Sequence, residues 1–418
     1  MNVSFTSTNT SQSFFLNVKN NAVSLTLDEI TVYTFDRAGR LVTAVIDGRT
    51  YRRGLDNRLL CKWRERKGVS WVGRRLWFSD IEVRQFLEGV HDNVRTALSA
   101  LERCAFEQNA DLQSKSGIDE AIDWLRRVAA FDVESLARDA ERMSSIYRPV
   151  TILPPDQYLS LVLQATEGCN YNRCTFCSFY RDRPFRIKPP EEFRNHISNV
   201  LAFLGDGITL RRSVFLADAN ALCMPREQLL PLLDLVNEML PMRSAASAKG
   251  HALEGIGSFV DAFSDPVRTT RDYAELKDRG VRRLYLGVET GSRELLRFLR
   301  KPQKPEDVRE TVDALKGAGL SVGVILMLGI GGDRFAARHV EESLDLLNSL
   351  PWSKGDLVFL SEFVEFPNLE YPELAAKAEI RALSAEQMEE QYHALRNGIR
   401  RTGSVPKIAP YNAEEFIY

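Results

Sequence analysis

Three cysteines, Cys169, Cys174 and Cys177, lie within one stretch of nine residues. They follow a short apolar segment, residues 158–164, that is typical of a β-strand. Cysteine thiolates are ligands for soft metals and for iron–sulfur clusters. Because no fourth cysteine lies nearby in the sequence, this ligand set would leave one metal position open for a substrate or cofactor.

Four interpretations fit the Cys-x4-Cys-x2-Cys spacing. One is a 4Fe-4S cluster in which the cysteines hold three irons and the fourth iron binds a small molecule. A second is a plant-type 2Fe-2S loop, which has this spacing but needs a fourth cysteine, and Cys223 is the only later one. A third is structural zinc, with His196 as the nearest candidate for a fourth ligand. The last is three unrelated buried thiols.

From residue 158 onward, short apolar segments alternate with helical patterns. Six such β/α units predict a parallel sheet that curls into part of a barrel, with ligand sites beyond the carboxyl ends of its strands. The cysteines follow the first strand, so we expect them at that edge of an α/β fold, a partial (β/α)6 TIM-like barrel. The predicted strands are 158–164, 213–216, 253–259, 283–288, 321–328 and 356–363, and the predicted helices are 190–204, 226–240, 271–278, 305–316 and 336–347.

The rest of the 418-residue chain is expected to form accessory parts around this barrel. Residues 1–22, rich in Ser, Thr and Asn, are predicted to be a flexible tail. Residues 23–148 are predicted to form an accessory domain of β-hairpins followed by helices. The barrel would then span residues 149–367, and residues 368–418 would form a helical extension.

The cysteine segment, placed after the first strand of such a barrel, resembles the radical S-adenosylmethionine (radical SAM) superfamily. Members usually have an aromatic residue before the third cysteine, and Phe176 stands there. Their commonest spacing is Cys-x3-Cys-x2-Cys, so this chain has one additional residue between the first two cysteines. The resemblance implies that Cys169, Cys174 and Cys177 form the catalytic centre of an enzyme. They would hold an oxygen-sensitive 4Fe-4S cluster whose open iron binds S-adenosylmethionine (SAM), the source of a 5′-deoxyadenosyl radical.

Further residues correspond in position to the cofactor pocket of that family. Asp218 and Asn220 take the place of a Gly-Gly-Glu-like stretch that receives the methionine amino group. Glu289 ends the fourth strand and would meet the ribose or the sulfonium, with Ser292 close behind it. Ile325 lies in a strand that resembles the adenine-contacting strand of the family. Alternatively, Glu289 interacts with a helix dipole and Ile325 is an ordinary core residue.

Residues 51–77 combine nine basic residues with three tryptophans. Basic residues interleaved with aromatic ones are typical of nucleic-acid binding, and also of a solvated face over a small β core. A second basic run, from Arg181 to Lys188, would guide an anionic substrate or a reductant, or would be an exposed loop. The basic residues of the first segment are Arg52, Arg53, Arg58, Lys62, Arg64, Arg66, Lys67, Arg74 and Arg75.

Composition and charge limit the partners and the cellular compartment that we expect for this protein. The formal net charge is −2, so any nucleic-acid role needs a local patch. Six cysteines are too few for a disulfide framework, and the chain shows no signal-peptide pattern and no apolar run that would span a bilayer. We therefore expect a cytoplasmic radical SAM enzyme that acts on a small molecule or natural-product intermediate and receives electrons from a flavodoxin- or ferredoxin-type donor, with no membrane partner. An RNA-modifying enzyme is the alternative, and a non-catalytic iron–sulfur or zinc protein is the alternative from another class.

Overall fold

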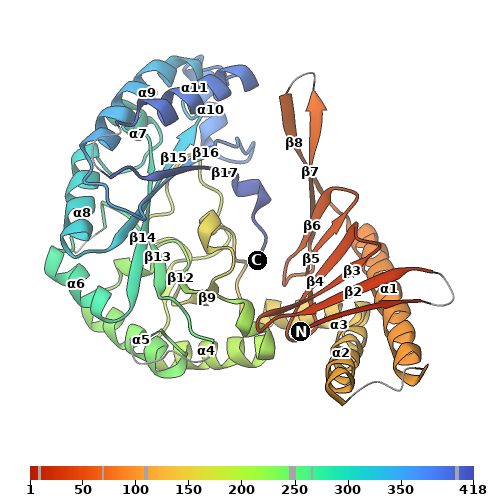
Figure 1. Ribbon diagram of the computed structural model, residues 1–418. Helices are drawn as coiled ribbons and strands as arrows, with labels where there is room; N and C mark the ends of the chain where they lie inside the picture. The colour runs from red at the N-terminus through yellow and green to blue at the C-terminus, as the bar shows by residue number, and fades with distance from the viewer. Residues whose placement is uncertain (8–10, 68–69, 108–111, 244–250, 265–266, 401–403) are drawn as a thin grey trace. The chain divides into compact units, whose positions relative to one another are not determined.

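The chain folds into two compact units, which are described separately below (Figure 1). The computed structural model describes residues 1–7, 11–67, 70–107, 112–243, 251–264, 267–400 and 404–418. The first unit comprises Met1–Pro149, Ser198–Arg212 and Ile417–Tyr418, and the second comprises Val150–Ile197 and Ser213–Phe416.

The first unit is an eight-stranded antiparallel sheet in which each strand pairs with the next in the sequence. Asp47 and Gly48 join β5 to β6 and both have positive φ, as tight two-residue hairpin turns require. The strands are β1 (Asn2–Thr6), β2 (Ser13–Val18), β3 (Ala22–Leu27), β4 (Thr31–Asp36), β5 (Leu41–Ile46), β6 (Arg49–Arg53), β7 (Leu59–Lys67) and β8 (Ser70–Trp77). Three helices follow, α1 (Asp80–Glu107), α2 (Leu112–Ala130) and α3 (Val133–Ile146), and η2 (Gly205–Leu210) also belongs to this unit.

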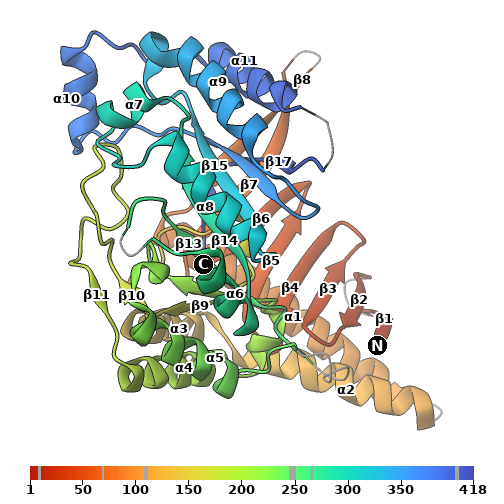
Figure 2. The ribbon, with the colours of Figure 1, turned by 90° about the vertical axis from the view of Figure 1, so that its left-hand side faces the viewer.

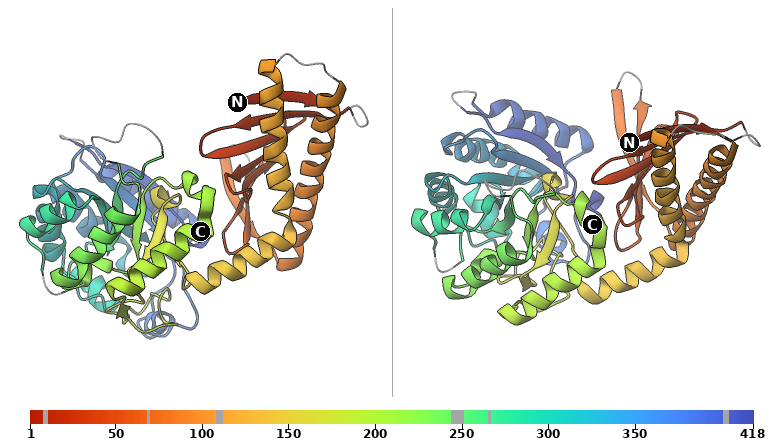
Figure 3. Two further views of the ribbon diagram at one scale, coloured as in Figure 1. Left: turned by 90° about the horizontal axis from the view of Figure 1, so that it is seen from below. Right: turned by 60° about the horizontal axis from the view of Figure 1, so that its bottom comes forward.

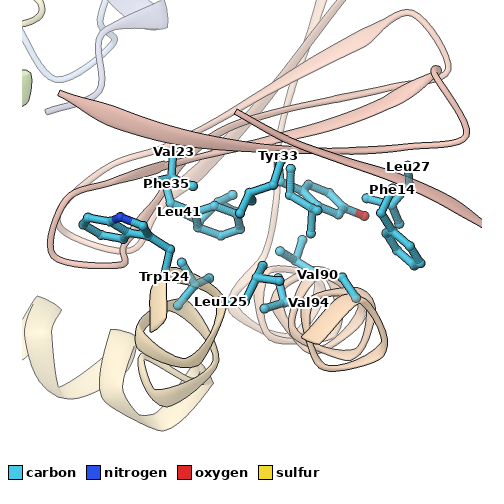
Figure 4. Packing of buried hydrophobic residues seen from close by; sticks show 14 of the residues in the cluster. Phe14, Val23, Leu27, Tyr33, Phe35, Leu41, Val90, Val94, Trp124 and Leu125 are labelled. Atoms are coloured by element: carbon cyan, nitrogen blue, oxygen red, sulfur yellow. The ribbon is translucent and has the colours of Figure 1, made fainter. Parts of the chain in front are cut away.

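One face of this sheet packs against the helices (Figures 3 and 4). Val90 and Val94 of α1 and Trp124 and Leu125 of α2 point toward strand residues such as Phe35, and all five side chains are buried. This one-sided packing follows from the alternation of apolar and polar residues along the strands, because successive strand residues point to opposite faces.

Within the predicted flexible tail of residues 1–22, the described residues 2–6 and 13–18 form two paired strands. β1 pairs with β2 in register from Asn2 opposite Asn17 to Thr6 opposite Ser13. Phe5 stacks on Phe14 with the ring centroids 5.2 Å apart. The polar residues that suggested a tail are the outward half of a strand alternation, whose other half is buried.

The second unit confirms the predicted α/β fold. Its parallel sheet has the order β17-β16-β15-β14-β13-β12-β9, so neighbouring strands follow one another in the sequence, and helices lie on its outer side (Figures 1 and 2). The strands are β9 (Leu161–Gln164), β12 (Val214–Ala217), β13 (Ile256–Val260), β14 (Val281–Glu289), β15 (Ser321–Leu328), β16 (Leu357–Glu362) and β17 (Lys407–Tyr411). The helices are α4 (Pro190–Leu204), of which the first half belongs to this unit, α5 (Arg226–Met239), α6 (Thr270–Asp278), α7 (Arg293–Phe298), α8 (Pro305–Gly317), α9 (Gly332–Ser349), α10 (Glu370–Lys377) and α11 (Ala385–Gly398).

The sequence predicted a helical C-terminal extension, but this segment also contains a strand. After α10 and α11, β17 joins the edge of the parallel sheet beside β16. Pro410 lies in this strand, and proline is tolerated at a sheet edge because no further strand needs its N–H. No helix in the described part of the chain is long and apolar enough to cross a membrane.

Candidate active site at the cysteine loop

The three cysteines lie at the carboxyl edge of the parallel sheet, as predicted from their place after the first strand. A short strand pair, β10 (Thr166–Glu167) with β11 (Arg186–Ile187), closes the base of the loop that carries them. Cys169, Cys174 and Cys177 line one pocket of about 1380 Å³, a volume that includes space open to solvent. All three cysteines therefore lie around one pocket at the carboxyl edge of the sheet, where ligand sites occur in β/α barrels.

Side chains fix the path of the four residues between Cys169 and Cys174. Asn170 donates from Nδ2 to Ser264 Oγ at 2.7 Å, and the Tyr171 hydroxyl donates to the Arg300 carbonyl at 2.6 Å. Asn172 has a φ of +47° and donates its backbone N–H to Cys169 Sγ at 3.3 Å. The loop with the additional residue is thus tied to two other segments of the barrel edge.

The basic residues after the cysteines make ion pairs and hydrogen bonds with the cysteine loop and with the residue that precedes it. Arg186 and Lys188 form ion pairs with Glu167 at 2.9 and 3.0 Å, just before the loop begins. Arg181, which is exposed, donates to the Cys174 carbonyl at 2.7 Å. The structure therefore uses these cations to hold the chain around the cysteines.

Asp218 lies behind the loop and is not one of the residues that line the pocket. Its buried carboxylate accepts from Gly168 N at 3.0 Å and from Gln164 Nε2 at 2.9 Å, and lies 3.4 Å from Arg183 Nε. Burial raises the pKa of Asp218, although Arg183 opposes that shift. The contacts assign Asp218 to supporting the cysteine loop, a different place from the predicted contact with the cofactor.

Asn220 does line the pocket, and its side chain belongs to a polar network. Its Nδ2 donates to Asp261 Oδ2 at 2.7 Å, while its Oδ1 accepts from Leu222 N at 3.0 Å. Asp261, directly after β13, also accepts from Ser264 Oγ at 2.6 Å. The network therefore joins the ends of β12 and β13 to Asn170 of the cysteine loop.

Glu289 faces the same pocket and is paired with a buried lysine. Lys301 Nζ lies 2.6 Å from Glu289 Oε1, and both residues line the pocket. A register irregularity in β14 and a φ of +64° at Glu289 direct this carboxylate. A Cβ at Gly287 would lie 2.7 Å from Glu289 Oε1, so only glycine leaves room for the pair.

Charge and burial compete at Lys301. Burial alone would lower the pKa of Lys301, but attraction to Glu289 and its hydrogen bond with that carboxylate, with a contribution from Cys174, raise it above its ordinary value. Lys301 is therefore a protonated, water-poor cation beside the cysteines.

The remaining predicted cofactor residues divide into two groups. Phe176 and Ile325 line the pocket. Ser292 is fully buried at the start of α7 and does not line it. Lys301 and Asp261 were not predicted as site residues. Asp261 had a positional signal, since it lies two residues after the predicted strand 253–259, whereas Lys301 follows a helix and had none.

Burial favours the protonated form of the Cys174 and Cys177 thiols. It raises the pKa of Cys174 to about 12 and that of Cys177 to about 11, with smaller effects from Lys301, Glu289 and the other thiols. Metal binding would then release protons from these residues.

Cys223 is nearer to the loop than its sequence separation suggests. It lies in η3 (Ala221–Cys223), after β12, the strand that pairs with β9. Burial raises the pKa of Cys223 to about 12, and the charges of Asp261 and Cys169 add to this rise. Cys223 is not among the residues that line the pocket.

The donor set fits a cluster better than a single ion. Among the residues that the structure describes, no three His, Cys, Asp or Glu side chains are close enough to share one metal ion. A 4Fe-4S cluster offers each thiolate its own iron, so three cysteines around one pocket suit it. His196, the candidate zinc ligand, accepts from Gln164 N at 3.1 Å and stacks with Phe193.

The barrel with its cysteine loop matches a known family. Residues 163–347 match the model of the radical SAM superfamily, and this stretch contains the three cysteines, Asp261, Glu289 and Lys301. Residues 163–347 therefore form a radical SAM superfamily domain. The cofactors of that superfamily are a 4Fe-4S cluster and SAM.

Individual relatives cover only parts of the chain. Heme chaperone HemW of Bacillus subtilis (strain 168) is 25% identical over 182 residues, which are 42% of this chain and 44% of HemW. Among solved structures, methylornithine synthase PylB is 17% identical with a TM-score of 0.39 and coverages of 57% and 62%. Coproporphyrinogen III oxidase HemN from Escherichia coli is 14% identical, with a TM-score of 0.39 and coverages of 61% and 55%. The chain thus spans less than half of HemW and less than two thirds of the two enzymes.

Proposed function

We propose that this protein is a radical SAM enzyme in which Cys169, Cys174 and Cys177 hold the 4Fe-4S cluster. When bound and reduced, the cluster supplies the electron that cleaves SAM and yields the 5′-deoxyadenosyl radical that removes a hydrogen atom from the substrate. The observation that carries the proposal is the gathering of the three cysteines around one pocket with Glu289 and Lys301.

The residues around the pocket take separate parts in this proposal. Glu289 and Lys301 would orient the polar groups of SAM, since a buried ion pair offers both an acceptor and a donor at fixed positions. Phe176 and Ile325 would contact its apolar surfaces. The side-chain amide of Asn220 is hydrogen-bonded to Asp261 and Leu222, so Asn220 would fix the conformation of the chain after β12. Asp218 would hold the loop, and Ser292 would support the turn after Glu289.

The substrate in this proposal is a small molecule or natural-product intermediate. Aromatic and aliphatic side chains line much of the pocket beyond the cysteines, among them Phe259, Phe263, Met327, Phe366 and Tyr411. Such a lining suits a substrate with an apolar body and excludes water from a reactive radical. The electron donor would be a flavodoxin- or ferredoxin-type protein.

A non-catalytic role is the second candidate, because the similar protein HemW is named as a heme chaperone. One experiment separates the two. The anaerobically reconstituted protein is mixed with dithionite and SAM, and 5′-deoxyadenosine is measured by liquid chromatography. We expect 5′-deoxyadenosine to form. Absence of the product, together with a cluster spectrum that SAM does not alter, would reject the enzyme.

A further inference from the structure

The hairpin of β7 and β8 has a basic face that the barrel chemistry does not use. It continues beyond the neighbouring strands of its sheet (Figure 1). Directly opposite residues of an antiparallel pair point to the same face. Lys62 lies opposite Arg75, and Arg64 lies opposite Gly73, so three cations share one face. The side chains of Lys67 and Trp71 lie outside the described part of the chain.

The same face continues onto the neighbouring strand. Thr50 of β6 lies opposite Lys62, and Arg52 lies opposite Leu60. Lys62, Arg64 and Arg75 are exposed, and Arg52 is partly exposed. Glu65 is the only acidic residue in the sequence of β6, β7 and β8, and it points to the opposite face, where it pairs with Arg74 at 2.8 Å. The described charged residues that β6, β7 and β8 contribute to this face, Arg52, Lys62, Arg64 and Arg75 among them, are therefore all basic.

An aromatic residue lies at the base of this face. Trp77 is opposite Leu60, which places it on the same side as Lys62 and Arg75, and it is partly exposed. The Arg58 guanidinium lies 5.1 Å from the centroid of the Trp77 ring. Nucleobases stack on both indole rings and guanidinium planes.

We propose that this face, defined by Arg52, Lys62, Arg64, Arg75 and Trp77, binds single-stranded RNA. Consecutive outward residues of one strand, such as Lys62 and Arg64, are spaced by about 6.7 Å, so the cations form a track along the ribbon. A track of cations with an aromatic platform binds an unpaired strand, since its bases are free to stack. The hydroxyl of Thr50 on the same face offers a partner for a ribose 2′-hydroxyl.

Binding to a fluorescein-labelled uridine 20-mer, followed by fluorescence anisotropy with the full chain, tests this proposal. We expect affinity to fall steeply between 50 and 200 mM KCl, because phosphate contacts release counterions. In the variant Lys62→Glu/Arg64→Glu/Arg75→Glu, affinity should drop at least about tenfold. The slope of log affinity against log salt should become shallower by about two, at about 0.7 per lost contact.

The matched control reverses three exposed arginines elsewhere in the same unit, Arg84→Glu/Arg95→Glu/Arg126→Glu. Its net charge changes equally, so it should keep most of the binding. Equal losses in both triple variants would mean a general charge effect and would overturn the proposal, as would no binding by the unsubstituted chain. Equal affinity for the matching thymidine 20-mer would overturn the assignment to RNA.

Circular dichroism and a melting curve verify that each variant folds. Cleavage of SAM by the basic-face variant should be unchanged, so this test is independent of the proposed function.

Discussion

In the parallel sheet of the second unit, adjacent residues of one strand are both buried, as Leu284 and Tyr285 in β14 are. In the antiparallel sheet of the first unit, Leu41 of β5 is buried against the helices while Thr43 is partly exposed. Side chains of a sheet covered on both faces meet a ligand mainly where the strands end. A sheet covered on one face keeps its other face for solvent or for a partner.

This difference explains where chemistry-bearing residues occur in each unit. In the barrel, the cysteine loop, Asp261 and Glu289 all follow or end strands, where loops and bulges turn side chains toward the pocket. In the antiparallel unit, Arg52, Lys62, Arg64 and Arg75 lie within strands, on the face away from the helices. Substitutions should therefore act at strand ends in the barrel and on one face in the other sheet.

The largest effect is expected at the cysteines. Cys174→Ala should lose the cluster altogether, because only two thiolates would remain at the pocket, while Cys223→Ala should keep it. Iron and sulfide content after anaerobic reconstitution measures both. Equal iron loss in the two variants would instead indicate a four-cysteine site, which the position of Cys223 near Cys169 makes a direct competitor.

The next largest effect is expected at the buried ion pair of the barrel edge. Lys301→Met leaves Glu289 buried without its partner and should cost about 3–5 kcal/mol of stability. It should also weaken SAM binding, measured from the change that SAM causes in the spectrum of the reduced cluster.

The matched control for Lys301 is its neighbour. Arg300 pairs with Glu370 in an exposed position, so Arg300→Met should cost about 1 kcal/mol or less. Urea unfolding of both variants gives the two free energies. Similar losses for the two would show that the pocket end of this loop is as open to water as its outer side, contrary to the structure.

A somewhat smaller effect should reveal the one-sided packing of the antiparallel sheet. Leu41→Ala should cost about 2–5 kcal/mol, because it opens a cavity against the helices. A register shift in the pairing of β4 with β5 places Thr43, two positions along the strand, on the other face from Leu41. Thr43→Ala should change stability by about 0.5 kcal/mol or less. In the barrel, Leu284→Ala and Tyr285→Ala should both be costly. A large loss for Thr43→Ala in urea unfolding would contradict the distinction between the two sheets.

Sequence patterns predicted the barrel better than the antiparallel sheet. The strand at 321–328 and the helix at 190–204 have the bounds that were predicted, since long apolar runs and a helix-starting proline are strong local signals. β1 and β2 were taken for a tail, because their outward residues are Ser, Thr and Asn and their strands are short. β17 was missed because it is a short edge strand that contains proline.

Site residues were predictable from the sequence where a position that corresponds to the cofactor pocket of the family also lies at or after a recognisable strand. The cysteines, Phe176, Asn220, Glu289 and Ile325 line the pocket, and their contacts with the cluster and the cofactor stay predictions. Asp218 follows its strand as expected, but its side chain turns toward Gly168 and Arg183, which no local pattern specifies. Lys301 reaches Glu289 only through the tertiary path of α7 and the loop after it.

The smallest effect concerns the additional residue of the cysteine loop. Asn170 reaches Ser264, which is held in turn by Asp261, so this chain of hydrogen bonds fixes the residue next to Cys169. We expect Asn170→Ala to speed iron release to a chelator by about two- to tenfold, the equivalent of a hydrogen bond of about 0.5–1.5 kcal/mol. Ser264→Ala should have a similar effect, and the double variant should be no faster than either single one, since both remove the same contact. Asn348→Ala, which removes hydrogen bonds to the Gly398 carbonyl and from the Arg400 N–H away from the pocket, should leave the rate unchanged. Additive effects of the two loop substitutions would show that Asn170 and Ser264 act separately, and that the cysteine loop keeps its path without this tie.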